Sequence, residues 1–249
     1  MSPINVVDSQ AASADTDLFK GKSVLFTGTT GFVGKVALSM MLHRYPELKK
    51  VYVLVRKGSA PSAEDRFFRK IIPSEPFDPI REALGERADA FFREKCEVLD
   101  GDITDPFFGI DEKKLEALVG QVDCVINCAG LVSFDPSLEL GLSVNVAGAQ
   151  YGVDLCKKIG APLVHVSTCF VAGNRSGLVF EDEPVIGYFP KRGELPDKDF
   201  SVDYELKDCE RLVAQARERA DDHALAARFR KAAIERLEAE GRDPNDEKT

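Results

Sequence analysis

Two side chains near the start of the chain, Tyr45 and Lys49, have the spacing of a proton-transfer pair. Residues four apart on a helix share one face, where a lysine ammonium lowers the pKa of a tyrosine hydroxyl and helps it to give up its proton. The helix expected here begins near Phe32 and runs about 20 Å before it reaches Tyr45. Pro46 also disfavours helical geometry at Tyr45. The pair is therefore far from any site at the start of the helix, and we interpret its spacing as a coincidence.

A glycine-rich segment, TGTTGFVG (27–34), follows the first expected strand and opens the same helix. Gly28 permits a tight turn, Gly31 lets the backbone approach a pyrophosphate, and Gly34 lets the helix pack closely on the strand. Free N–H groups at the helix start then face the phosphates, and the helix dipole favours negative charge there. The sequence therefore predicts a dinucleotide phosphate site made by Gly28, Thr30, Gly31, Phe32, Val33 and Gly34.

The elements that must position this site alternate regularly from residue 22 onward. Short apolar runs predict strands at 23–27, 51–55, 96–100, 123–127 and 162–167, and helical patterns occupy 32–44, 112–120 and 137–158. Continuous apolar strands separated by helices indicate a parallel sheet covered on both faces. The expected fold class is α/β: a Rossmann-type doubly wound parallel sheet, truncated after about five strands, with a C-terminal helical polar extension.

Changes in composition divide the chain into three expected regions. Residues 1–17 are predicted to be a disordered tail, and residues 18–175 a nucleotide-binding domain with an insertion over 58–95. Residues 176–249 are predicted to be a polar loop and surface helices that begin an incomplete substrate-side region. Three Phe pairs, at 67–68, 91–92 and 107–108, are expected to pack in the core, with the lining of an apolar channel as the alternative.

The overall composition excludes several classes of protein. The formal net charge of −9 gives no electrostatic basis for binding nucleic acid or an anionic membrane surface. No apolar run approaches the roughly 20 residues that span a bilayer, and the first residues lack the pattern of a secretory signal. The six cysteines have neither a Cys-x-x-Cys pair nor histidines at metal spacing, so no metal site is expected. The expected location is the cytoplasm, with peripheral membrane association of the full-length protein left open.

The residues after the second and third strands indicate which dinucleotide binds. Enzymes that use NAD usually place an acid after the second strand, where it binds the ribose 2′-hydroxyl, whereas this chain has Arg56. A guanidinium grips a 2′-phosphate with two hydrogen bonds, so NADP(H) is favoured; the alternative is a solvated surface arginine. Asp102 is placed to contact the adenine edge, with helix capping as the alternative.

Several motifs together resemble the extended short-chain dehydrogenase/reductase superfamily. They are TGTTGFVGK, VYVLVR, the DGD after the third strand, NCAGLVSFD (127–135), SVNVAG (143–148) and HVSTCF (165–170). Within that superfamily, residues 18–175 are most similar to the fatty acyl-CoA reductases, and next to the thioester-reductase domains of carboxylic acid reductases. The resemblance implies cofactor contacts from Ile103, Asn127, Cys128 and Ala129 in addition to those above.

The resemblance also implies a reaction, the NADPH-dependent reduction of a long-chain acyl-CoA thioester to an aldehyde, a fatty alcohol or both. Hydride arrives at the thioester carbon while a hydroxyl group stabilises the developing oxyanion. Thr168, after the fifth strand, is the candidate for a hydroxyl that binds the substrate oxygen, and Asn145 for a residue that supports the site. A local hydrogen bond remains the alternative for Thr168, and a structural role for Asn145. His165 is expected to be a core histidine.

The catalytic Tyr-x-x-x-Lys of this family is missing after Thr168. Tyr188 is followed four positions on by Arg192, and Tyr204 by Asp208. We therefore expect the chain to be an N-terminal fragment, inactive alone, whose partner is the remainder of the full-length enzyme. Two other interpretations stay open. One is a nucleotide-sugar epimerase or dehydratase of the same superfamily, and the other is a non-catalytic NADP(H)-binding module.

Overall fold

The computed structural model describes residues 18–172, 177–182 and 201–243. The predicted tail over 1–17 lies outside the described residues. The chain divides into two compact units, one made of residues 1–136 and 140–171 and the other of 137–139 and 172–249. Every residue predicted from sequence to form the site lies in the first unit. Within the described ranges, the structure has no helix with the length and apolar character that a membrane span requires.

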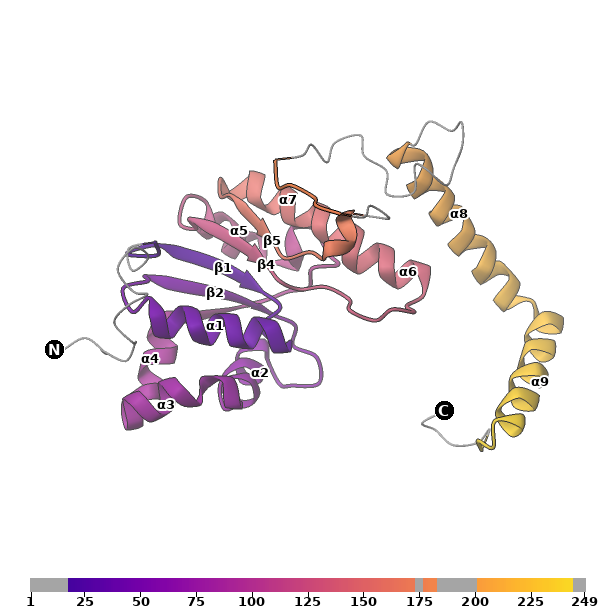
Figure 1. The fold of residues 1–249 in the computed structure, drawn as a ribbon, viewed down its shortest axis with the longest axis horizontal. Helices are drawn as coiled ribbons and strands as arrows, with labels where there is room; N and C mark the ends of the chain where they lie inside the picture. Colours follow the sequence, from indigo (N-terminus) through magenta and orange to yellow (C-terminus); the bar gives the residue numbers. More distant parts are fainter. Residues whose placement is uncertain (1–17, 173–176, 183–200, 244–249) are drawn as a thin grey trace. The chain divides into compact units, whose positions relative to one another are not determined.

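A parallel sheet of five strands forms the centre of the first unit (Figure 1). The strands are β1 (Ser23–Thr27), β2 (Lys50–Val55), β3 (Cys96–Asp100), β4 (Cys124–Asn127) and β5 (Leu163–His165). Their spatial order is β3-β2-β1-β4-β5, and all four pairings are parallel. The strand order therefore runs outward in one direction from β1 to β3 and in the other from β4 to β5. Open α/β sheets bind ligands at such a switch point, here between β1 and β4. The predicted doubly wound Rossmann-type sheet is confirmed.

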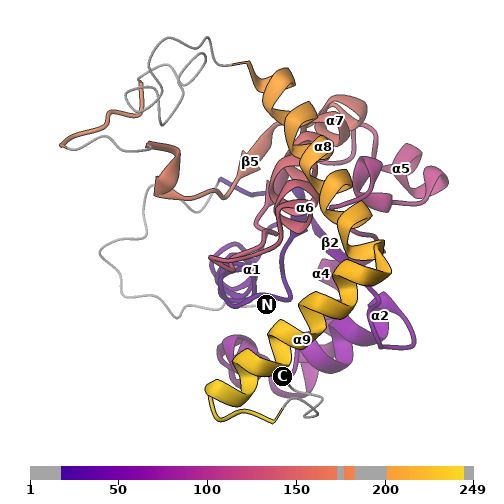
Figure 2. The ribbon, with the colours of Figure 1, turned by 90° about the vertical axis from the view of Figure 1, so that its right-hand side faces the viewer.

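Alternate residues of the strands supply two separate cores, one on each face of the sheet. Val24, Phe26 and Val53 point to the face covered by α1 (Phe32–Arg44), and Leu25 and Leu99 point to the opposite face. The second face is covered by α5 (Glu112–Leu118) and α7 (Gly148–Ile159), which Figure 2 shows side by side. Strands buried on both faces explain why the sequence shows continuous apolar runs and not alternation.

The insertion over 58–95 completes the core on the α1 side. Its elements are α2 (Ala63–Arg66), a π-helix (Phe67–Ile71), 3₁₀ turns (Glu75–Phe77 and Gly85–Arg87), α3 (Asp78–Leu84) and α4 (Ala88–Lys95). Phe67 and Phe92 are fully buried, and their pair partners Phe68 and Phe91 are partly buried and pack against the same core, to which the fully buried Phe77 also belongs. The buried Ser39 hydroxyl of α1 donates a hydrogen bond of 2.5 Å to the Pro76 carbonyl and so joins the insertion to α1.

A short left-handed turn, Pro106–Gly109, follows β3. Phe107, Phe108 and Gly109 have φ values of 51°, 61° and 62°. For residues with side chains this conformation costs about 1–2 kcal/mol each, so tertiary contacts must hold it in place. Phe108 is completely buried whereas Phe107 is 37% exposed. The third Phe pair is thus divided between core and surface.

The helical pattern predicted over 137–158 is present but irregular. It consists of α6 (Leu138–Gly141), a π-helix (Leu142–Ala147) and α7. Beyond β5 the chain forms a 3₁₀ turn (Cys169–Ala172). The second unit contains the two long polar helices α8 (Val202–Asp221) and α9 (His223–Ala239), neither of which has a described residue that is fully buried. The sequence predicted surface helices over 176–249, and α8 and α9 are found in the part of that stretch that the structure describes.

Candidate dinucleotide-binding site

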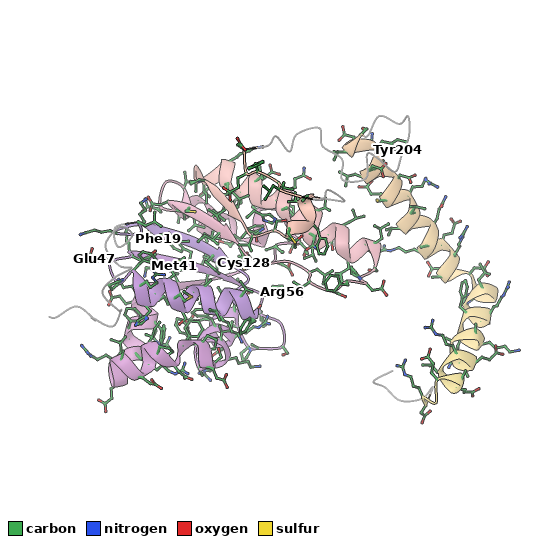
Figure 3. All side chains as sticks on the ribbon, in the orientation of Figure 1. Phe19, Met41, Glu47, Arg56, Cys128 and Tyr204 are labelled. Atoms are coloured by element: carbon green, nitrogen blue, oxygen red, sulfur yellow. The ribbon has the colours of Figure 1, made fainter. Side chains whose placement is uncertain are left out.

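The candidate site lies at the carboxyl edge of the sheet, and Tyr45 lies at the opposite edge. Figure 3 shows Arg56 and Cys128, which follow β2 and β4, at one end of the strands, with Phe19 and Glu47 at the other. The Tyr45 ring packs edge-on against Phe19 with 4.9 Å between the ring centroids. Its backbone leaves helical geometry directly after α1. The Tyr45 ring therefore has a packing contact far from the candidate site, and its spacing from Lys49 is coincidental.

The glycine-rich loop between β1 and α1 is shaped by close backbone contacts. Gly28 has φ of +80°, and a Cβ atom there would lie 2.6 Å from the backbone carbonyl of Cys128. A Cβ on Gly34 would overlap the carbonyl oxygen of Gly28. A Cβ on Gly31, in contrast, would meet only that same oxygen, at an ordinary 3.4 Å. Two glycines are thus required by packing, and the third leaves open space beside the loop.

The start of α1 offers the groups that bind phosphate. Gly31 is the N-cap and provides no side-chain cap, and the first helical hydrogen bond runs from the Lys35 N–H to the Gly31 carbonyl. The N–H groups of Phe32, Val33 and Gly34 precede that bond and have no partner within the helix. Phe32 and Val33 are exposed, whereas Gly34 is buried, so the helix start reaches the surface at its first two residues. The residues present therefore fit a dinucleotide pyrophosphate, which is drawn to such a helix start.

Thr29 and Thr30 lie between the glycines in very different surroundings. Thr30, one of the predicted phosphate contacts, is exposed. The Thr29 hydroxyl is fully buried and, within the part of the chain that the structure describes, has no hydrogen-bond partner. An unpaired buried hydroxyl is unfavourable. The fold therefore carries an unsatisfied polar group in the predicted phosphate loop, one that the sequence did not single out.

Arg56 and Asp102 form an ion pair across the ends of β2 and β3. The distance from Arg56 Nη1 to Asp102 Oδ2 is 3.3 Å, and the two side chains are 66% and 28% exposed. Partial burial raises the pKa of the Asp102 carboxyl, but hydrogen bonds from Thr104 and the Arg56 charge outweigh it, so the pKa is lowered overall. Asp102 is therefore ionised at neutral pH. It caps no helix; its other oxygen accepts a hydrogen bond of 3.0 Å from the Thr104 N–H.

A second guanidinium supports the backbone at Arg56. Arg66 of α2 donates a hydrogen bond of 2.7 Å from Nη1 to the Arg56 carbonyl oxygen. The same nitrogen would lie 3.3 Å from a Cβ on Gly58. The insertion thus brings another positive charge to the end of β2. Sequence reasoning missed Arg66 because the partner is a backbone carbonyl ten residues away, which leaves no pattern in the sequence.

Asn127 belongs to a polar chain that crosses three neighbouring strands. The Thr27 hydroxyl donates to Asn127 Oδ1 at 2.6 Å and accepts from the Ala129 N–H at 3.2 Å. Asn127 Nδ2 lies 3.2 Å from His165 Nδ1. Asn127 is buried, so its amide is engaged by protein groups. The expectation of a core histidine was wrong: His165 is exposed, because β5 is an edge strand of the described sheet.

Three other predicted cofactor contacts differ in their exposure. Cys128 is half-buried beside Gly28, and burial raises the pKa of its thiol. Ala129 follows it, with its N–H bonded to Thr27. Ile103 is buried, and a Cβ on Gly148 of α7 would lie 3.3 Å from its Cδ1 atom. Its side chain is therefore part of the core.

Asn145 holds the loop that follows β4. Its Oδ1 accepts a hydrogen bond of 2.8 Å from the Leu131 N–H, and its Nδ2 donates one of 3.1 Å to the Leu131 carbonyl. It stands in the π-helix Leu142–Ala147, which displaces its side chain from regular α-helical register. The structure therefore gives Asn145 a positioning contact.

Thr168 is exposed and follows β5. Its Oγ1 accepts a hydrogen bond of 3.2 Å from the Phe170 N–H, which is the local contact considered as the alternative. The hydroxyl hydrogen remains available because that contact uses only a lone pair of the oxygen. Of the later tyrosines, Tyr188 lies outside the described residues and Tyr204 is exposed on α8.

Comparison with known proteins identifies the family. The model of an NAD-binding family described as Male sterility protein matches residues 26–237. The chain belongs to this family. It is 35% identical over 164 residues to a probable fatty acyl-CoA reductase 4 of Arabidopsis thaliana, covering 64% of this chain and 33% of that protein. It is 31% identical over 174 residues to an alcohol-forming fatty acyl-CoA reductase of Simmondsia chinensis, covering 69% and 35%.

A solved structure of related fold is the terminal R domain from the myxalamid PKS-NRPS biosynthetic pathway. It has a TM-score of 0.53 and 26% identity, and the match covers 66% of this chain and 40% of that one. The resemblance to the fatty acyl-CoA reductases and the extended short-chain dehydrogenase/reductases is confirmed by these matches. The match to this NAD-binding family supports a nicotinamide dinucleotide as the cofactor of the chain. The chain spans about a third of the length of the curated relatives it matches.

Proposed function

We propose that this chain is the cofactor-binding part of an NADPH-dependent reductase of long-chain fatty acyl-CoA thioesters. The observation that carries the choice of NADPH is the Arg56 guanidinium at the end of β2, paired with Asp102 at 3.3 Å. An arginine there favours a 2′-phosphate, which an acid would repel. The 35% identity to a fatty acyl-CoA reductase supports the substrate class. The product is an aldehyde, a fatty alcohol or both.

The described residues divide the binding of the cofactor between them. The start of α1 would hold the pyrophosphate, because Gly31 leaves space beside the loop and the first N–H groups of the helix have no partner within it. Arg56 binds the 2′-phosphate, and Arg66 adds positive charge behind it through its contact with the Arg56 carbonyl. Asp102 lies beside them, where its carboxylate accepts a hydrogen bond from the adenine amine. When bound, NADPH supplies the hydride.

The substrate carbonyl is proposed to lie near Thr168, at the end of β5. The Thr168 hydroxyl donates a hydrogen bond to the thioester oxygen, because its local contact with Phe170 uses it only as an acceptor. Asn145 does not contact the substrate; its two hydrogen bonds to the Leu131 backbone hold the loop beside the site. Proton transfer by a Tyr-Lys pair is assigned to the remainder of the enzyme, since the tyrosines after Thr168 lack a lysine at the required spacing.

Cofactor binding is tested on the 249-residue chain itself. Titration with NADPH and NADH, followed by nicotinamide fluorescence, should show tighter binding of NADPH. Replacing Arg56 by Ala should weaken NADPH binding about 10- to 100-fold, the range for a lost charge-assisted hydrogen bond. The same change at Lys70, an exposed cation of the insertion, is the matched control and should have little effect. Equal affinities for NADPH and NADH in the unmodified chain would overturn the assignment of NADPH.

Turnover is tested on the full-length protein that carries this chain. NADPH consumption should depend on a long-chain acyl-CoA and release free CoA thiol. Thr168→Ala should lower kcat, and Thr168→Ser, which keeps the hydroxyl, should restore most of it. NADPH-independent turnover of nucleotide sugars would reject the reductase in favour of an epimerase or dehydratase. Binding of NADPH without turnover of either substrate would favour a binding module.

A further inference from the structure

We propose that the left-handed turn Pro106–Gly109 positions the cofactor-selecting pair. The turn fixes the Asp102 carboxylate, and Asp102 in turn holds the Arg56 guanidinium where the 2′-phosphate binds. The inference rests on the proposed function, because it concerns how that site distinguishes NADPH from NADH. It assigns a role to Phe108 and Gly152, neither of which lies among the predicted cofactor contacts.

The conformation of the turn is one that its residues would not adopt without support. Phe107, Phe108 and Gly109 all have φ between 51° and 62°. Bulky side chains rarely occupy this region, and such outliers persist only where the surrounding structure imposes them. No local preference of a Phe-Phe sequence explains it. The cause must therefore lie in the contacts that the turn makes.

Packing of Phe108 against α7 supplies that support. The Phe108 ring is fully buried in the core on the α5 and α7 side of the sheet. A Cβ on Gly152 would lie 3.1 Å from the ring's Cζ atom, closer than most real contacts of this kind. A side chain at this point of α7 would push the ring out of its observed position by a few tenths of an ångström. The space beside Gly152 thus lets the Phe108 ring pack in the core, and this packing holds Phe108 in its left-handed backbone conformation.

Three backbone hydrogen bonds connect the seated Phe108 to Asp102. The Asp102 N–H donates to the Phe108 carbonyl at 2.9 Å. The Asp105 N–H donates to the Asp102 carbonyl at 3.1 Å, and the Phe108 N–H donates to the Asp105 carbonyl at 2.9 Å. Both backbone polar groups of Asp102 are therefore bonded within this turn. The chain cannot shift at Asp102 without moving Phe108.

The Asp102 side chain, whose position the turn fixes, in turn contacts the Arg56 guanidinium. One carboxylate oxygen is held by the Thr104 N–H at 3.0 Å, and the other lies 3.3 Å from Arg56 Nη1. The Arg56 side chain is 66% exposed, so packing does little to fix its guanidinium. An oriented guanidinium binds a phosphate with less loss of side-chain freedom than a mobile one. The turn therefore acts on cofactor choice through Asp102, as a positioning element.

A matched pair of glycine substitutions tests this role. Gly109 and Gly120 have φ of +62° and +67°, so an added Cβ strains the backbone at both. At Gly120, after α5, the Cβ meets nothing within 4 Å, whereas at Gly109 it meets the Asp105 side chain at 3.2 Å. Both variants should therefore melt at reduced temperatures because of the backbone strain that they share. Only Gly109→Ala disturbs the turn.

The readout is the ratio of the dissociation constants of NAD⁺ and NADP⁺ for the 249-residue chain, measured by titration calorimetry. The unmodified chain should favour NADP⁺. Gly109→Ala should reduce that ratio about tenfold, mainly by weakening NADP⁺ binding, while Gly120→Ala leaves it unchanged. Gly152→Ala reaches the same turn from α7, where alanine favours the helix, and should reduce the ratio as well. If Gly109→Ala does not fold, the measurement on Gly152→Ala replaces it.

Different results would overturn the positioning role of the turn and the proposed cofactor. A folded Gly109→Ala or Gly152→Ala that keeps the full preference for NADP⁺ would overturn the positioning role and leave the proposed function intact. An unmodified chain that binds NADP⁺ no better than NAD⁺ would overturn the proposed cofactor itself. An equal loss of preference in Gly120→Ala would show that general destabilisation, and not the turn, controls the ratio, and would also overturn the positioning role.

Discussion

The backbone of Gly34 lies so close to Gly28 that any side chain at position 34 would overlap the Gly28 carbonyl oxygen. This contact joins the first turn of α1 to the loop that leaves β1. Gly31, three residues earlier, faces open space instead. One motif therefore contains two glycines that the fold requires and a third, Gly31, for which we propose a role in binding the ligand, and substitutions can separate the two roles.

We expect Gly31→Ala to fold and Gly34→Ala to be strongly destabilised. Gly31 has φ of −83°, which alanine adopts without strain, and its Cβ would be in ordinary contact at 3.4 Å. The Gly34 variant must move backbone atoms to relieve its overlap. Thermal melting should place Gly31→Ala within a few degrees of the unmodified chain, at about 1 kcal/mol or less of lost stability. Its NADPH affinity should nevertheless fall. Unimpaired binding by Gly31→Ala would contradict the ligand role.

Asp102→Asn should remove a pH-dependent contribution to the free energy of unfolding, the one made by the ionised carboxylate. The pKa of Asp102 is lowered in the folded chain, so the carboxylate contributes stability above its unfolded value of about 3.9. That contribution is lost as the pH falls through the still lower folded pKa. The stability difference between the two proteins should therefore shrink between about pH 5 and pH 3. Urea unfolding at several pH values measures it, and a difference that stays constant over this range would contradict the shift.

Phe108→Ala should destabilise the chain far more than Phe107→Ala. The two residues share the left-handed conformation, so the backbone cost is matched and only the burial of the side chains differs. Removing a fully buried phenylalanine costs about 3–5 kcal/mol, whereas Phe107 is partly exposed and should cost about 1 kcal/mol. Denaturant unfolding with a constant m-value gives both numbers. Equal losses would show that Phe108 is not seated in the core.

Asn145→Ala should free the Leu131 amide from its side-chain partner. The substitution removes both hydrogen bonds, while Asn145→Asp keeps the acceptor for the Leu131 N–H and loses only the donor to its carbonyl. Because such contacts contribute about 0.5–1.5 kcal/mol each, hydrogen exchange at Leu131 should be fastest in the Ala variant and intermediate in the Asp variant. Exchange that is unchanged in both would argue against the positioning role.

Local patterns in the sequence predicted much of the fold. The apolar run 23–27, the glycines after it and the helix 32–44 were predictable because each follows from neighbouring residues, and their bounds in the structure agree. The strand ends that carry Arg56 and Asp102 were predictable for the same reason. The ion pair between them was not, because it depends on the register of β2 with β3.

Other features of the site depend on contacts that no local pattern records. The left-handed turn contradicts the preferences of Phe107 and Phe108, and its cause, Gly152, lies more than 40 residues further along the chain. The partner of Asn145 is a backbone group, so the identity of Leu131 carries no signal. The exposure of His165 follows from the position of β5 at an edge of the described sheet, which alternation along one strand cannot reveal.

The chain of contacts from Thr27 through Asn127 to His165 has a consequence for how the sheet assembles. The three residues are direct neighbours in the pairing of β1, β4 and β5. Because successive side chains of a strand point to opposite faces, a shift by one residue would turn Asn127 away from both partners and bury its amide unsatisfied. The cost of that unsatisfied amide adds to the preference that buried apolar residues of the strands already give to this register. This polar chain therefore acts as a register pin: it favours the observed alignment of β1, β4 and β5, and so it sets the level of the carboxyl ends at the edge where we propose that the cofactor binds.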